Sequence, residues 1–348
     1  MAETSLSRIL EKVTSRNQLS GDEIIYLLQL EGDDLKQLLN QADRVRARML
    51  GNKIHLRGII EFSNNCRRNC KYCGLRQDNL ALPRYSLAAE EIVAMAGQGA
   101  KLGYRTIVLQ SGEDYYDAEK IAWIIREIKG QTDSAITLCL GERDYQEYKL
   151  WRAMGADRYL LKLETADPDL YHNLHPDMDY QQRRERLAWL KELGYQVGSG
   201  NIIGLPGQTE ETIVQDLLLF KELDLEMVGI GPFIAHPGTP LADFKNGSVA
   251  MTLKTVAITR LLLPLSHLPA TTALGSIDRQ GRQQALRAGA NVVMPNITAA
   301  EYRSFYQIYP AKICINEQAV DCRRCIGGII AALGREVAVD CGHSPKMV

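Results

Sequence analysis

Three cysteines lie close together in the segment EFSNNCRRNCKYCGLRQDN, residues 61–79. Cys66, Cys70 and Cys73 have the spacing C-x3-C-x2-C, and the aromatic residue Tyr72 precedes the third cysteine. A zinc site usually needs four ligands in paired C-x2–4-C units, and this segment supplies no second pair. Three thiolates instead suit a 4Fe-4S cluster with one iron left open for a ligand that is not protein. A three-cysteine zinc knuckle, or fortuitous clustering, is the alternative.

The other five cysteines divide into a second group and two single residues. Cys314, Cys322 and Cys325 form the group, whereas Cys139 and Cys341 stand apart. Thiols in a reducing compartment usually stay reduced unless they bind metal or react, so we predict two metal sites and no disulfide framework. Basic residues in the first cysteine loop would offset the negative charge of a cluster held by thiolates; they are Arg67, Arg68, Lys71 and Arg76.

Composition narrows the class of protein. The chain has 348 residues, of which 45% are hydrophobic and 24% charged, as is ordinary for a soluble globular protein. A formal net charge of −1 argues against a broad nucleic-acid-binding face, so partners are expected to be small molecules or proteins. The sequence contains neither a leader-like apolar core at its start nor a run of about 18 apolar residues. We therefore expect a cytoplasmic protein without membrane contact.

The elements that must position the cysteines follow from hydrophobic periodicity. Residues 5–50 have helical spacing, with a capping box at Ser20–Glu23. Eight short apolar runs then alternate with amphipathic helical stretches, which predicts an α/β fold: a full (β/α)8 TIM barrel, with a six-stranded open version as the alternative. The expected strands are 55–62, 105–112, 135–141, 158–164, 196–206, 226–235, 268–275 and 291–296.

Three parts of the chain follow from this pattern. Residues 1–53 are an N-terminal helical extension, residues 54–300 the barrel, and residues 301–348 a C-terminal extension that carries the second cysteine group and packs on the barrel. Reactive groups of such barrels lie at the carboxyl ends of the strands. Cys66 directly follows the first run. Further polar or glycine-rich signals at the ends of runs are 111–114, 164–165, 204–207, 232–236, 271–272 and 294–296.

The first cysteine loop resembles the signature of the radical S-adenosylmethionine (SAM) superfamily. That resemblance implies a 4Fe-4S cluster whose open iron is chelated by the amino and carboxylate groups of SAM. It also implies that one electron from the cluster cleaves SAM to a 5′-deoxyadenosyl radical, while the protein orients the reactants and excludes water. The enclosed interior of a barrel suits so reactive a species.

Further segments are similar to SAM-binding segments of biotin-synthase-like members of the superfamily. Ser111, Gly112 and Glu113 resemble the motif that receives the SAM amino group. Glu164 and Arg183 resemble the pair that holds the ribose hydroxyls and the SAM carboxylate. The stretch NIIGLPGQT is similar to the segment that packs the adenine. Cofactor contacts are thereby expected from Tyr72, Gln110, Ser111, Gly112, Glu113, Glu164, Arg183, Ile203, Gly204 and Leu205.

Strand alternation predicts the barrel interior. If Glu164 points inward, Lys162 and Arg158 share its side of the strand. Buried cations are costly unless an anion meets them, so we expect an anionic or carboxylate-bearing substrate below the SAM. The expected substrate ligands are Arg158, Lys162, Thr271, Thr272, Met294 and Tyr306.

The whole chain resembles the HydE family of FeFe-hydrogenase maturases through long stretches that include TIVLQSGED, GADRYLLKLETA and MVGIGPFIAHPGTPL. The resemblance implies a role in assembling the two-iron part of the hydrogenase active site, the H-cluster. The implied substrate is a cysteine-bound iron complex with CO and cyanide, or another amino-acid-derived small molecule, and companion maturases and an electron donor are implied partners. Cys314, Cys322 and Cys325 match the site at which some members carry an accessory 2Fe-2S cluster, with Cys341 or water as a candidate fourth ligand. A vestigial or structural role of this group is the alternative.

Two rival functions stay open. Another biotin-synthase-like enzyme, above all methylornithine synthase, shares the helical arm, the barrel and the strand that ends in glutamate. Biotin synthase itself is disfavoured, since Glu164–Asp167 replaces its Tyr-Asn-His-Asn-Leu-Asp stretch. The other rival is a metal-carrying scaffold in which both cysteine groups merely hold iron or zinc.

Overall fold

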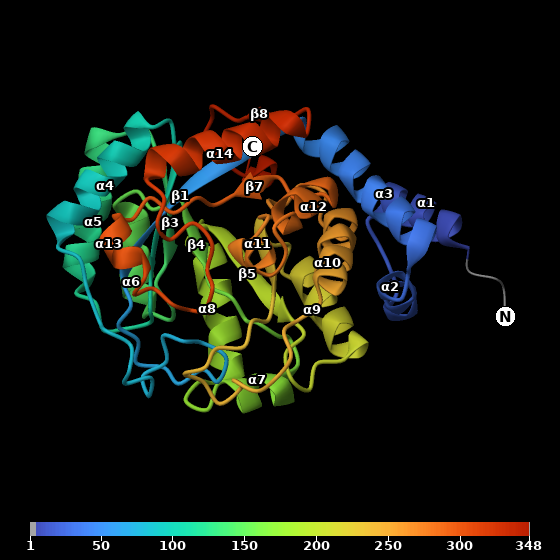
Figure 1. The fold of residues 1–348 in the computed structure, drawn as a ribbon, viewed down its shortest axis with the longest axis horizontal. Coiled ribbons are helices and arrows are strands. Elements are labelled where there is room, and N and C mark those ends of the chain that lie inside the picture. The colour runs from blue at the N-terminus through green and yellow to red at the C-terminus, as the bar shows by residue number, and fades with distance from the viewer. Residues whose placement is uncertain (1–4, 348) are drawn as a thin grey trace.

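The computed structural model describes residues 5–347 and begins with a helical arm (Figure 1). The arm consists of α1 (Leu6–Arg16), α2 (Gly21–Leu28) and α3 (Gly32–Leu50). The predicted capping box is confirmed, because the Ser20 hydroxyl accepts from the Glu23 amide and the Glu23 carboxylate accepts from the Ser20 amide. Apolar residues of the arm join the main hydrophobic core, and α2 and α3 pack on α10.

Within the described residues, seven parallel strands form one curled sheet in the order β6-β5-β4-β3-β2-β1-β7, and the short strand β8 pairs with the start of β1. The strands are β1 (Lys53–Ser63), β2 (Thr106–Ser111), β3 (Ala135–Cys139), β4 (Arg158–Leu160), β5 (Gln196–Ile203), β6 (Met227–Pro232), β7 (Val292–Val293) and β8 (Glu336–Val337).

The expectation of a full eight-stranded barrel is wrong. The first six predicted strands are present, but the seventh, residues 268–275, is not a strand. Its neighbourhood contributes only isolated bridges, from His267 to Met227 and from Pro269 to Val292, after which the chain turns into α11 (Thr272–Ile277). The fold is therefore a partial TIM-like barrel. Between the first residues of β6 and β7, the segment 267–269 forms one isolated bridge to each strand.

Helices follow the strands and lie outside the sheet (Figure 1). Figure 1 also shows α14 crossing one end of the molecule near β8 and α7 lying at the opposite end. None of the helices in residues 5–347 is long and apolar enough to span a membrane. The remaining helices are α4 (Ala89–Lys101), α5 (Ala118–Gln131), α6 (Tyr145–Ala153), α7 (Pro168–Leu174), α8 (Tyr180–Glu192), α9 (Glu210–Glu222), α10 (Val249–Leu262), α12 (Gly281–Arg287), α13 (Ala300–Arg303), α14 (Ala319–Ala332) and the 3-10 helix η1 (Pro345–Met347).

The C-terminal tail binds Arg158 at the amino end of the strands. The Arg158 guanidinium donates to the carbonyls of Cys341 (2.8 Å) and Gly342 (2.9 Å), and its Nε donates to Gln196 (3.2 Å). Arg158 is the first residue of β4, so it lies at the end of the sheet opposite to the cysteine loop. The prediction that Arg158 binds substrate is therefore corrected: this arginine is fully buried and holds the tail.

Replacing Arg158 with methionine is expected to lower the free energy of unfolding by about 1–3 kcal/mol, because buried tail carbonyls lose their donor. SAM binding should be unchanged. Urea unfolding of wild type and variant measures the first effect and calorimetric titration the second, with Arg126→Met at an exposed position as the control. A variant with wild-type stability but weakened SAM binding would contradict the assignment.

Candidate active site

Backbone hydrogen bonds fix the cysteine loop that follows β1. The amide of Arg67 donates to the Glu113 carbonyl (2.8 Å), that of Lys71 to Leu174 (2.9 Å) and that of Gly74 to Ile308 (3.0 Å). The loop is thus tied to the segments after β2, α7 and α13. The loop places Cys66, Cys70 and Cys73 after the carboxyl end of β1, near enough to one another to affect each other's pKa.

Arg84 holds the loop from within. Its Nη1 donates to the carbonyls of Asn64 (2.6 Å) and Leu75 (2.8 Å), and its Nη2 donates to the carbonyl of Arg76 (2.7 Å). One guanidinium therefore connects both sides of the loop. In the described structure, residues 64–84 form neither a helix nor a strand. The sequence gives no signal for this role, because nothing in the sequence around Arg84 distinguishes it from an arginine on the surface.

The three thiols suit metal ligation. Burial raises the pKa of all three, to about 12 for Cys73, and for Cys70 and Cys73 a neighbouring cysteine adds to the rise. Such thiols ionise only when a cation binds them, and iron is such a cation. All eight cysteines are free thiols, so none of the three is consumed by a disulfide. The residues present fit a 4Fe-4S cluster.

Gly112 brings the end of β2 against the cysteine loop. A Cβ at this position would lie 2.2 Å from the Asn65 carbonyl oxygen and 3.0 Å from the Cys66 Cβ. The resemblance to other family members assigns Gly112 to the segment that receives the SAM amino group. The contact that requires glycine is the one with the loop, so Gly112 positions the cysteines.

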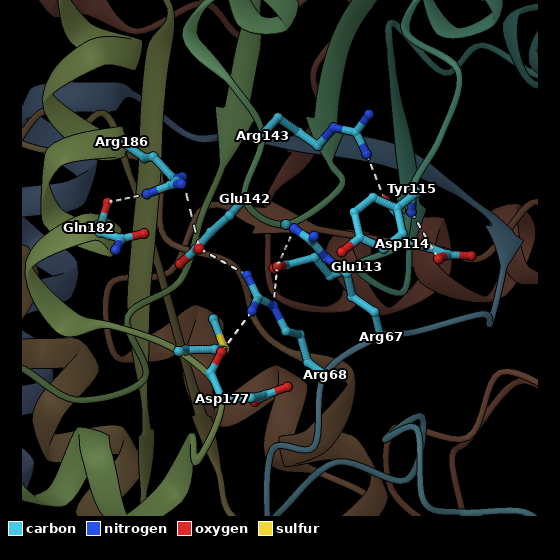
Figure 2. Close-up of polar contacts among 12 residues, drawn as sticks. Arg67, Arg68, Glu113, Asp114, Tyr115, Glu142, Arg143, Asp177, Gln182 and Arg186 are labelled. Carbon is cyan, nitrogen blue, oxygen red and sulfur yellow. Dashed lines mark hydrogen bonds and ion pairs between the residues drawn. The ribbon is translucent and has the colours of Figure 1, made fainter.

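Buried arginines and glutamates surround the loop on one side (Figure 2). Arg68 pairs with Glu113 (2.5 Å) and with Glu142 (3.1 Å), and Arg183 reaches Glu142 (3.2 Å) and Glu113 (3.4 Å). Burial acts to raise the pKa of Glu113, but the arginines outweigh it and the pKa is lowered. Glu113 is therefore an anion held by the guanidinium groups of Arg68 and Arg183, with that of Arg67 at 3.5 Å.

We define this arginine–glutamate cluster as Arg67, Arg68, Glu113, Glu142, Arg183 and Arg186. Four cations against two anions leave two positive charges beside the cysteines, which offsets the charge of a thiolate-ligated cluster. Sequence reasoning missed Glu142 and Arg186. Glu142 could have been found, since it directly follows the predicted third strand at the same rim.

Glu164 has an unusual backbone. Its φ is +68°, a left-handed conformation that is uncommon for residues other than glycine and that concentrates at functional sites. The Glu164 carboxylate pairs with Lys162 (2.7 Å), and Arg183 donates to the Lys162 carbonyl (2.9 and 3.1 Å). The structure therefore brings together the three residues that the sequence placed beside SAM and substrate.

An apolar cluster lies beside the third cysteine. Tyr72 packs on a buried group that includes Leu205, and its hydroxyl lies 2.8 Å from His175 Nε2. Ile203 is buried in the main core. Gly204 has φ +88°, and a Cβ at this position would lie 2.4 Å from the α-carbon of Gly247. This arrangement gives the segment at the end of β5 an apolar face of the kind that a purine ring requires.

The interior side chains lie at two levels. Gln110 donates to the hydroxyl of the buried Tyr306 (3.3 Å), while Met294 lines two separate cavities. In the cavity nearer the amino ends, Nε and Nη2 of the fully buried Arg57 have no hydrogen-bond partner within residues 5–347. Arg57, which sequence reasoning missed, supplies the interior cation that was expected from Arg158.

The two predicted threonines lie near this interior. Thr271 caps α11 and faces Gly231, and its hydroxyl is buried without a partner in the described chain. Thr272, the first residue of α11, accepts from Arg282 and lines the other cavity. Ser111 is also buried, and its hydroxyl donates to the Gly112 carbonyl (2.7 Å).

The second cysteine group is only partly assembled. Cys314 and Cys322 lie with Glu317 so that their ligand atoms are within 4.8 Å of one another. A hydrogen bond from Cys322 lowers the pKa of Cys314 to about 6 and raises that of Cys322. Cys325 is exposed and lies outside this trio, and Cys341 faces the Asp133 carbonyl. The third ligand in the structure is thus a carboxylate that the sequence did not suggest.

Asp216 connects the turn after β4 to β5. Its carboxylate accepts from the Ala166 amide (2.5 Å) and from Asn201 Nδ2 (2.7 Å), and Asn201 forms a parallel bridge with Glu164. Burial raises the Asp216 pKa from 3.8 to about 7.

The raised pKa predicts a pH-dependent stability. Between about pH 4 and pH 7 the folded state keeps a proton that the unfolded chain releases, so the unfolding free energy falls as the pH rises. Above about pH 7 the contribution of Asp216 is constant. Buried histidines with lowered pKa values act in the opposite direction in both proteins, so the effect of Asp216 is the difference between them. In urea unfolding from pH 5 to 8, the unfolding free energy of wild type minus that of Asp216→Asn should fall as the pH rises toward 7; equal slopes in the two proteins would contradict it.

Comparisons with known proteins agree with this geometry. A family model described as the radical SAM superfamily matches residues 60–220. The chain is 49% identical over 341 residues to the [FeFe] hydrogenase maturase subunit HydE of Thermotoga maritima, covering 97% of each chain. It is 33% identical over 297 residues to the 3-methylornithine synthase of Methanosarcina acetivorans, covering 84% of each. A crystal structure of methylornithine synthase matches with a TM-score of 0.84 at 27% identity, over 95% of this chain and 97% of that one. The chain therefore belongs to the HydE family of radical SAM enzymes.

Proposed function

We propose that this enzyme takes part in assembling the two-iron subcluster of FeFe-hydrogenase and acts on a cysteine-bound iron complex with CO and cyanide. The observation that carries the proposal is the 49% identity to a HydE maturase over 97% of both chains. The cysteine loop and the arginine–glutamate cluster support it, because they give the site the ligands and the positive charge that a 4Fe-4S cluster needs.

Cys66, Cys70 and Cys73 are proposed to hold the 4Fe-4S cluster. When bound, the cluster and SAM together supply a 5′-deoxyadenosyl radical. The proposed SAM contacts divide by chemistry. Residues 110–113 take the amino group, Glu164 and Arg183 take the ribose and the carboxylate, and Tyr72 and residues 203–205 pack beside the adenine. Since Glu113 is held by arginines, we propose that it acts on the amino group with its charge already partly balanced.

The substrate is proposed to be anionic. Arg57 supports this, because Nε and Nη2 of its buried guanidinium have no partner in the described chain. Lys162 is a second interior cation, and it is paired with Glu164. Thr271, Thr272, Met294 and Tyr306 are proposed to shape the pocket. The trio of Cys314, Glu317 and Cys322 is proposed to hold an accessory 2Fe-2S cluster with one more ligand.

The wider setting is also a proposal. The partners are companion hydrogenase maturases and an electron donor, in the cytoplasm. The division into a helical extension (1–53), a barrel (54–300) and a C-terminal extension (301–348) agrees with the places of α1–α3 and of α14, although one hydrophobic core runs through all three.

A second candidate is a methylornithine-synthase-type rearrangement of lysine. The TM-score of 0.84 over 95% of this chain favours it as the alternative. Its substrate is an amino acid with a positively charged side chain, whereas the interior of this chain contains the cations Lys162 and Arg57.

The test uses anaerobically reconstituted protein with SAM and dithionite. The protein is expected to restore hydrogenase activity to a maturation extract that lacks this component, and to consume the cysteine–iron–dicarbonyl–cyanide complex. Turnover of lysine alone would favour the alternative. No formation of 5′-deoxyadenosine with any substrate would favour a metal-carrying scaffold.

A further inference from the structure

A polar pocket lies between the carboxyl ends of β1 and β7 and the start of the C-terminal segment. Its charged and polar lining consists of Glu61, Thr272, Arg282, Asn296 and Lys312, together with the sulfur-bearing side chains of Met294, Cys314 and Cys322. Glu61 comes from β1, whereas the other residues lie between positions 272 and 322 of the chain. None of the SAM-binding segments contributes to this lining.

One wall of the pocket is an acceptor for an ammonium group. The Glu61 side chain is only 3% exposed, and one of its oxygens accepts from Asn296 Nδ2 (2.6 Å). The other oxygen pairs with the ammonium of Lys312, which reaches in from the segment after α13. A buried carboxylate is stable only with such a partner. Lys312 therefore occupies the position that an ammonium ligand of Glu61 would take.

The other wall is the guanidinium of Arg282, of which only Nε lacks an acceptor in the described chain. Arg282 is 7% exposed; its Nη2 donates to Thr272 (3.1 Å) and its Nη1 faces the sulfur of Cys314 at 3.8 Å. Its Nε is buried and has no hydrogen-bond partner in the part of the chain that the structure describes. A buried guanidinium N–H without an acceptor is costly, which points to a missing anion.

We propose that this pocket binds the charged end of an amino-acid substrate, with Arg282 receiving the carboxylate and Glu61 the ammonium. Without a ligand, the Lys312 ammonium then takes the place of the ligand's ammonium at Glu61. When the ligand displaces it, Lys312 stays in the same pocket as the ligand's carboxylate. The choice of an amino-acid substrate rests on the proposed function. The pairing of one buried carboxylate with one unsatisfied guanidinium rests on the geometry alone.

The position of the pocket agrees with this role. Glu61 lies near the end of β1, five residues before Cys66, and the Tyr85 hydroxyl donates to its carbonyl at 2.5 Å. The substrate's charged end would thus be fixed on the sheet wall that leads directly into the cysteine loop. A reacting group further along the substrate then extends toward the loop, as orientation of a radical reaction requires.

The test measures binding to the full-length reconstituted protein with SAM by calorimetry. Three probes separate the two charges: S-methyl-l-cysteine, its decarboxylated analogue 2-(methylthio)ethylamine, and its deaminated analogue 3-(methylthio)propanoate. Arg282→Gln is expected to weaken S-methyl-l-cysteine and the propanoate by about tenfold or more while leaving the amine unchanged. Glu61→Gln should weaken S-methyl-l-cysteine and the amine and spare the propanoate.

Two further variants keep the result interpretable. Arg279→Gln, at an exposed position three residues before Arg282, should bind all probes like wild type. Lys312→Met removes the internal competitor and should tighten binding of the amine, whereas loss of a merely structural lysine would weaken it. Equal weakening of all three probes by Arg282→Gln, or no binding of S-methyl-l-cysteine to wild type, would overturn the inference. Since no probe is turned over, failure of hydrogenase rescue with this selectivity intact would reject the proposed function alone.

Discussion

Cys66→Ser is expected to lower formation of 5′-deoxyadenosine from SAM and dithionite by more than about 100-fold. Loss of an outer-shell partner of a metal ligand typically costs 10- to 100-fold in metal affinity or activity, and Cys66 is proposed as a direct ligand. Serine keeps the size of the side chain but is a poor ligand for iron. The loop backbone is held by other segments, so the variant should still fold.

Iron content and the cluster's absorption spectrum, measured after anaerobic reconstitution, show whether the variant has lost its cluster, independently of turnover. The matched control is Cys341→Ser, because the Cys341 thiol faces the Asp133 carbonyl at the opposite end of the strands. This control should retain wild-type formation of deoxyadenosine. A Cys66→Ser protein with full activity, or a wild-type protein that reconstitutes with zinc and ignores SAM, would reject the radical SAM assignment of this loop.

The sequence predicts the fold well where apolar runs are continuous. Strands β1 to β6 are present because each is a run buried by helices on the outside. The expected seventh strand failed for local reasons. Pro269 has no N–H to donate to a neighbouring strand, and the chain turns at Thr271 into a helix that begins at Thr272. The two-residue strand β8 is too short to give any periodic signal.

Alternation along a strand predicts which face of the sheet a side chain occupies, but not how far along the barrel axis it lies. Arg158 and Glu164 were assigned to the same side, yet they are six residues apart, which is about 20 Å in an extended strand. Arg158 therefore reaches the amino end and the C-terminal tail, whereas Glu164 lies at the opposite end, where its charge acts on Cys73 of the cysteine loop. Depth can be inferred only from the position of a residue within its strand, and β4 ends at Leu160 instead of continuing to Glu164 as the sequence suggested.

The cysteine loop was predictable because its chemistry lies in one contiguous segment. The pocket of Glu61, Arg282 and Lys312 was not, since Glu61 lies more than 200 positions before the two cations. A single sequence offers no reason to pair Glu61 with Lys312. Only the curling of the sheet, which brings β1 beside β7 and the C-terminal segment, creates the site.

Gly112→Ala is expected to prevent correct assembly of the iron site although it adds one methyl group. Gly112 does not have a positive φ, so alanine is compatible with its backbone and the effect comes from the contact alone. The new Cβ would lie 2.2 Å from the Asn65 carbonyl oxygen, which belongs to the backbone and cannot turn aside. Either the end of β2 or the loop that carries Cys66 must move, at about 1–3 kcal/mol for such overpacking.

Displacement of the loop moves Cys66 relative to the other two thiols, so iron binding should suffer more than folding does. We expect iron and sulfide content to fall at least severalfold, with a reduction of the unfolding free energy within the same 1–3 kcal/mol. Gly130→Ala is the matched control: its Cβ would meet nothing within 4 Å in the described chain, and alanine favours helix α5. Normal iron content in Gly112→Ala would mean that the close approach of β2 does not position the cysteines.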